Sequence, residues 1–118
     1  MRKTIGIPLG SSVALVALAI PTLGSTVGQS VRVNEVDGRI ALSARPKAGI
    51  VKFVVRNNGD EGHNLMIRGG GKRWATRVFG VGGSQTLTAK LKKGVRYSYW
   101  CGVSDHAQEG MRGSFVAR

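Results

Sequence analysis

Hydrophobic and polar residues alternate with a period of two along most of the chain after residue 30. Such alternation places one face of an extended strand against a core and the other face in solvent. The clearest run covers residues 50–57, where Val51, Phe53 and Val55 share one face and Lys52 and Arg56 share the other. The pattern predicts seven or eight short strands, with 76–81 the weakest candidate, at residues 31–36, 39–43, 50–57, 64–68, 76–81, 87–92, 95–101 and 112–117.

Glycine-rich turns separate these runs. Asp37-Gly38 is a strong tight-turn signal and predicts a hairpin between the first two strands. The stretch 69–73, which begins with three glycines, is predicted to be a loop. The chain after residue 28 shows no helical pattern, internal repeat or second domain. We therefore expect an all-β fold, a seven- to eight-stranded Greek-key β-sandwich, with Cys101 and Phe115 facing inward.

The first 28 residues resemble a secretory signal peptide. Arg2 and Lys3 precede an apolar run at 13–20, which Pro21 ends and small residues follow. We interpret 1–28 as the signal peptide and 29–118 as one domain. This interpretation predicts an exported protein, periplasmic or extracellular, that would be membrane-associated if the signal segment were retained.

Charge and cysteine content narrow the class of protein. The chain carries 18 Lys and Arg against 6 Asp and Glu, a net charge of +12. Within residues 29–118 the balance is 16 to 6, or +10. A single cysteine excludes an intramolecular disulfide, a four-cysteine zinc site and a cysteine-only iron–sulfur site. An unpaired thiol in an exported protein is open to oxidation, and ligation to a metal would protect it.

Four side chains form a candidate metal site. Cys101, His106 and Met111 lie within eleven residues at a strand–loop–strand corner, and His63 lies at a loop–strand boundary. Each residue alone is more often a core or surface residue than a ligand. A thiolate, two imidazoles and a thioether together suit a copper ion that cycles between Cu(I) and Cu(II) with a weak axial thioether.

The spacing of these residues resembles that of the cupredoxins, the blue-copper family that includes plastocyanin, azurin and rusticyanin. The resemblance covers residues 31–118 and is carried by Gly62-His63-Asn64 and by 99–111. It implies one type 1 copper ion bound by His63, Cys101, His106 and Met111. It further implies a weak contact from the Gly62 carbonyl and a hydrogen bond by which Asn64 ties the two ligand loops together.

The resemblance also implies the function of a one-electron carrier rather than an enzyme. The exposed edge of His106, ringed by Val103, Ala107 and Gly110, would be the electron port. A monomer that meets an acidic redox partner is expected, with a steering cluster at Lys90, Lys92 and Lys93. We expect no nucleic-acid partner.

Two alternatives remain open at this point. One is a copper carrier or storage module on the same fold. The other is a metal-free basic sandwich that binds anionic polymers or an anionic membrane surface, because a charge of +10 on about 90 residues is large.

Overall fold

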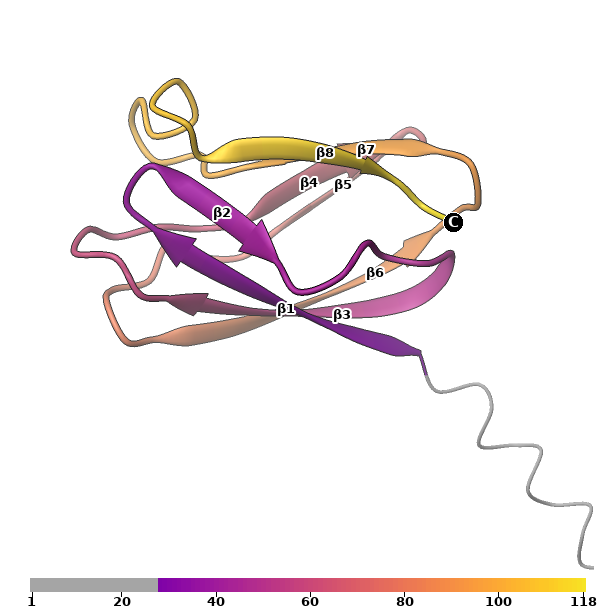
Figure 1. The fold of residues 1–118 in the computed structure, drawn as a ribbon, viewed down its shortest axis with the longest axis horizontal. Helices are drawn as coiled ribbons and strands as arrows, with labels where there is room; N and C mark the ends of the chain where they lie inside the picture. The colour runs from indigo at the N-terminus through magenta and orange to yellow at the C-terminus, as the bar shows by residue number, and fades with distance from the viewer. Residues whose placement is uncertain (1–27) are drawn as a thin grey trace, which may run out of the picture.

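The computed structural model describes residues 28–118, so the proposed signal peptide lies outside the described residues except for Gly28. Two four-stranded sheets face one another as two layers (Figure 1). The strand order is β2-β1-β3-β6 in the first sheet and β5-β4-β7-β8 in the second. The predicted all-β sandwich is confirmed. Its eight strands are β1 Gln29–Val36, β2 Arg39–Leu42, β3 Gly49–Asn57, β4 Met66–Gly69, β5 Lys72–Ala75, β6 Ser84–Leu91, β7 Arg96–Trp100 and β8 Arg112–Val116.

The core between the sheets follows from the alternation in the sequence. In β3, Val51, Phe53 and Val55 are fully buried, as predicted, while the residues between them face solvent. The second sheet supplies aromatic partners. Phe115 of β8 lies 6.3 Å from the ring of Phe53 and 5.6 Å from the ring of Tyr97. Removing these large apolar side chains from water is the main force that holds the sheets together.

The predicted hairpin between β1 and β2 is confirmed. Val36 pairs with Arg39, and Gly38 in the turn has a φ of 86°, which glycine adopts without strain. β1 also pairs with β3 in parallel, with Glu35 opposite Asn57. The parallel pairing brings the β1–β2 turn to the same end of the sandwich as the loop that leaves β3.

The loops gather at two opposite ends. The site end comprises the β1–β2, β3–β4, β5–β6 and β7–β8 connections, at the left of Figure 1. The far end comprises the start of β1, the β2–β3, β4–β5 and β6–β7 connections, and the C-terminal residue, at the right. No helix in the described residues is long and apolar enough to cross a membrane.

The prediction for residues 69–81 was wrong in two places. Residues 69–73 are not all loop, because Gly70 and Gly71 form a two-residue turn between β4 and β5. Both have positive φ, 58° and 78°, which is the conformation that a tight hairpin requires. Residues 76–81 do not form a strand. They contain only the bridge from Phe79 to His63.

One charged residue lies in the core. Glu35 is fully buried on the inward face of β1, and neither carboxylate oxygen has a hydrogen-bond partner. Burial disfavours the ionised form and raises the pKa of Glu35 from 4.5 to about 8. Alternation with Val31 and Val33 places this side chain on the inward face of the strand, although a buried carboxyl was not among the features predicted from the sequence.

Glu35 is therefore expected to make the protein less stable as pH rises. Its pKa is higher in the folded state than in the unfolded state, so stability is greatest below about pH 4.5 and declines until about pH 8. Glu35→Gln should remove this decline and raise the free energy of unfolding by about 2–3 kcal/mol at pH 7. Urea unfolding of both proteins at pH 5 and pH 8 measures the difference. Equal slopes with pH in the two proteins would contradict the expectation.

Candidate metal centre

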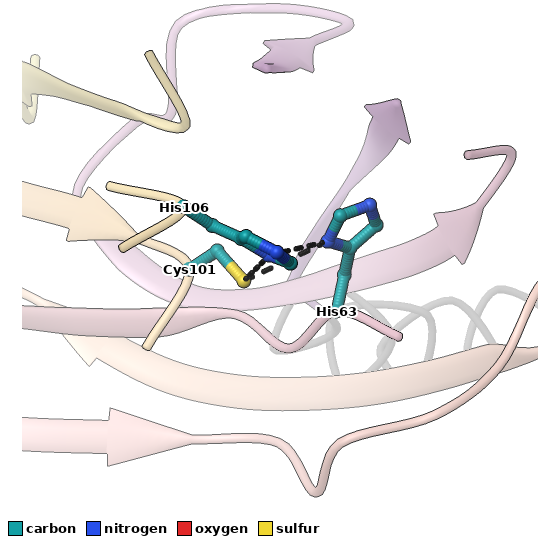
Figure 2. A group of neighbouring side chains, drawn as sticks. All are labelled: His63, Cys101 and His106. Carbon is teal, nitrogen blue, oxygen red and sulfur yellow. Dashed lines mark hydrogen bonds between the residues drawn. The ribbon is translucent and has the colours of Figure 1, made fainter. Parts of the chain in front are cut away.

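Three of the four predicted ligands meet at the site end. Figure 2 shows the two imidazoles and the thiol turned toward a common point. His63 Nδ1 lies 3.2 Å from His106 Nδ1, and Cys101 Sγ lies 3.8 Å from His63 Nδ1 and 3.7 Å from His106 Nδ1. Within residues 28–118, these three residues are the group of His, Cys, Asp and Glu side chains whose ligand atoms lie close enough together to hold a metal ion.

The loops reach this point because backbone hydrogen bonds connect them. His63 forms a two-way bridge with Phe79, with N–O distances of 3.1 and 2.9 Å. Cys101 follows β7 directly, and its N–H donates to the Met111 carbonyl at 3.1 Å. The N–H of Met111 donates in turn to the carbonyl of His106 at 3.0 Å. The β7–β8 loop is thus closed on itself around the thiol.

Met111, the fourth predicted ligand, is fully buried at the base of this loop. Its backbone connects Cys101 and His106, so the structure brings it to the same corner as the three donors. Its role as an axial ligand stays a prediction, as does the contact from the Gly62 carbonyl.

The predicted tie between the two ligand loops is confirmed. The side-chain oxygen of Asn64 accepts a hydrogen bond from the backbone N–H of Gly102 at 2.7 Å. This bond joins the residue after His63 to the residue after Cys101. It therefore holds the imidazole and the sulfur at a set separation.

Each imidazole also contacts a carboxylate through Nε2, the ring nitrogen that does not belong to the donor cluster. His63 Nε2 lies 2.8 Å from Asp37 Oδ1, and His106 Nε2 lies 3.1 Å from Glu61 Oε1. The pKa of Asp37 is lowered, mainly by its hydrogen bond with His63 and also by the N–H groups of residues 60 and 61. An ionised carboxylate can only accept, so a neutral imidazole carries its proton on Nε2 and leaves a lone pair on Nδ1.

Glycine at position 59 leaves room for the first of these contacts. A Cβ at Gly59 would lie 2.9 Å from His63 Nε2 and closer still to Asp37. That separation is too short for ordinary packing, so a side chain here would push the carboxylate and the imidazole apart.

The arrangement of the donors fits a metal ion. Two neutral imidazoles would set two lone pairs 3.2 Å apart with no proton between them, which is repulsive unless a cation lies between the nitrogens. An ion bound at about 2.0–2.3 Å in a trigonal plane separates a nitrogen from the sulfur by about 3.7 Å. The observed 3.7 and 3.8 Å match that separation.

The environment of the Cys101 thiol also favours a bound metal ion. Burial raises the pKa of Cys101, and the N–H groups of Asn64 and Val103 oppose the increase. Glu35 adds to the increase only where it is ionised, above its own pKa of about 8. Without a cation the sulfur therefore stays protonated at neutral pH. A thiolate at this position needs the charge of a bound metal to stabilise it.

His106 is the ligand candidate nearest to solvent. Its side chain is 11% exposed, whereas that of His63 is 0% exposed. Two of the exposed apolar residues of the described chain, Val78 and Val81, lie on the β5–β6 loop at the same end. Val78 lies near Gly62, where a Cβ added to the glycine would be 3.3 Å from the Val78 side chain. The site end therefore offers apolar surface beyond the residues that the sequence analysis named.

Sequence reasoning missed Asp37, Glu61 and Gly59. Asp37 was interpreted only as a turn residue, and it lies 26 residues from its partner His63. Glu61 is 45 positions before His106 in the printed sequence. Neither contact has a local sequence signal, because both depend on how the loops are brought together.

Comparisons with known proteins concern the fold. No family model and no curated protein sequence matches the chain. Among solved structures, a dithionite-reduced auracyanin from Roseiflexus castenholzii matches with a TM-score of 0.63 and 18% identity, over 78% of this chain and 98% of that one. Auracyanin B matches with a TM-score of 0.65 and 19% identity, over 76% and 88%.

A multicopper oxidase matches less well, with a TM-score of 0.55 and 16% identity, over 75% of this chain and 41% of that one. At these identities the likeness concerns the fold. The chain has the cupredoxin fold, and its His-Cys-His cluster is consistent with a blue-copper site.

Asp37 is expected to be needed for tight metal binding. Asp37→Asn keeps an acceptor for His63 but removes the charge, so the affinity for Cu(II) should fall about 10-fold or more. The matched control is Asp60→Asn, which removes a charge from the neighbouring β3–β4 loop without touching either imidazole. Competition with a chelator of known affinity measures both variants. An equal loss in the two would mean that general charge, rather than this contact, governs the affinity.

Proposed function

We propose that this protein is a one-electron carrier with a single type 1 copper ion held by His63, Cys101, His106 and Met111. The observation that carries the proposal is the triangle of two Nδ1 atoms and one Sγ. Its two N–S sides match a trigonal metal site, and its N–N side of 3.2 Å corresponds to a narrower angle between the two nitrogens. A bound copper would supply a centre that alternates between Cu(I) and Cu(II). The cupredoxin fold of the two auracyanins supports the same proposal.

The protein's own residues would supply rigidity. Asn64, Asp37 and Glu61 fix the loops and rings through hydrogen bonds from outside the donor triangle. Donors held in this way change position little when the charge of the ion changes, so little reorganisation opposes electron transfer. The partly exposed edge of His106 would be the port, because the other donors are buried.

The cofactor is tested by the visible spectrum. The purified protein with Cu(II) should show an intense thiolate-to-copper charge-transfer band, and Cys101→Ser should lose it while keeping its circular dichroism. A reversible one-electron wave in voltammetry, with no loss of copper, separates an electron carrier from a copper carrier or store. A band that survives in Cys101→Ser, or that never forms in the parent, would falsify the site.

The axial position is tested by the reduction potential. Met111→Gln should lower the potential, because an oxygen donor favours Cu(II) more than a thioether does. Met111→Leu should raise it, because the axial donor is lost. Potentiometric titration of both variants gives the answer. Two potentials equal to that of the parent would place Met111 in the core alone.

We further propose an acidic redox partner, drawn in by the net charge of +10 on residues 29–118. Lys90, Lys92 and Lys93 lie at the far end of the sandwich, away from His106. Attraction would come from the charge of the whole molecule, because the loops around His106 themselves carry the exposed acidic residues. The close contact would be made by the apolar surface around His106.

Stopped-flow electron transfer across a salt series checks this charge dependence. The second-order rate should fall with rising salt for an acidic partner and rise for a basic one. The same salt response for both partners would show that the protein's charge does not guide docking.

A further inference from the structure

Acidic residues are confined to one end of the sandwich, whereas basic residues occur at both ends. All six acidic residues of the chain lie in or next to the loops of the site end, and five of them are exposed. They are Glu35, which is buried, and Asp37, Asp60, Glu61, Asp105 and Glu109. Their contacts place them together: Asp37 binds the N–H groups of residues 60 and 61, and Glu61 binds His106.

The far end has the opposite character. Exposed basic residues gather there. Six of them, here called the cationic end, come from the β2–β3 and β6–β7 loops and from the adjoining ends of β5 and β6: Arg45, Lys47, Lys72, Lys90, Lys92 and Lys93. Three of them line one hollow, namely Lys72, Lys90 and Lys92. Lys47 lies beside the start of β1, where its N–H donates to the side chain of Gln29 at 2.9 Å.

None of the six residues forms an ion pair within the part of the chain that the structure describes. No acidic residue lies at this end of the described chain. Like charges held together without counter-charges repel one another, and the repulsion is relieved when an anionic surface binds. The cationic end is therefore complementary to a dense negative surface.

The course of the chain identifies which negative surface fits best. Gly28 packs against the backbone of Ile50, so the chain enters the sandwich at the far end. Ile50 itself is 47% exposed and stands opposite Lys90 in the sheet. The apolar run at 13–20 ends eight residues before Gly28, so it would adjoin this end of the sandwich if the predicted signal segment were retained. Basic residues next to an apolar segment are typical of binding to an anionic lipid surface.

We propose that the cationic end binds the anionic phospholipid surface of a bilayer and turns the site end away from it. β3, with nine residues, is roughly 30 Å long and spans the distance between the two ends. His106 would then face the aqueous phase, where a redox partner can reach it. The proposal does not depend on the metal, because none of the six basic residues belongs to the site.

Vesicle sedimentation tests the proposal on the full chain. Partition is measured into phosphatidylglycerol vesicles and into phosphatidylcholine vesicles, and their ratio cancels any contribution of residues 1–27 that is common to both lipids. The test variant replaces Lys90, Lys92 and Lys93 by Gln. The matched control replaces Arg39, Arg77 and Arg112 by Gln, which removes the same charge from the site end.

The phosphatidylglycerol preference should fall about 100-fold in the lysine variant, from about fivefold per basic residue, and less than about threefold in the arginine control. Equal losses in the two variants would show that net charge alone attracts the protein and would overturn the proposal. So would a lack of preference for phosphatidylglycerol in the parent. Tighter binding to a soluble polyanion such as heparin would assign the cationic end to another class of partner. An unchanged copper spectrum in all three proteins keeps the result separate from that of the metal site.

Discussion

Two imidazole nitrogens and one sulfur held within 3.8 Å of one another are the constraint on which the rest of the structure depends. Such a cluster is unfavourable without a cation, because lone pairs face lone pairs and the buried thiol resists ionisation. Contacts from outside the cluster keep the donors together. Asp37 and Glu61 contact the two imidazole rings, and the side chain of Asn64 accepts a hydrogen bond from the backbone N–H of the residue after Cys101. The three donors are thereby held in place by groups that lie outside the cluster.

Much of the sandwich could be predicted from the sequence because strand periodicity and turn chemistry are local. The inward face of β3 and the Asp37-Gly38 hairpin follow directly from such patterns. The errors were also local in origin. Gly70-Gly71 has the composition of a loop, yet its two positive φ angles make it a tight turn that continues the sheet. Residues 76–81 are apolar enough for a strand, but their backbone binds the His63 loop instead.

The candidate ligands could be identified from residue type and spacing, since few combinations of thiol, imidazole and thioether serve anything but a soft metal. The residues that hold the ligands in place could not. Asp37, Glu61 and Gly59 act only through contacts made by the tertiary fold. Glu35 is a different case, because the period of β1 indicates that it is buried and the residue type argues against it. In the structure Glu35 is buried, as the period of the strand indicates, and its carboxyl group has no hydrogen-bond partner.

The Asp37 contact ties the metal centre to the N-terminal hairpin. Asp37 lies in the turn of the first hairpin, whereas the three donors come from loops formed 26 or more residues later in the chain. An ion that binds more tightly when His63 is held by Asp37 must, by thermodynamic reciprocity, hold that hairpin more tightly in place. Metal binding should therefore slow the local unfolding of the hairpin formed by β1 and β2, which is the most N-terminal part of the sandwich. Resistance of this hairpin to proteolysis would then report whether the distant sulfur and imidazoles are occupied.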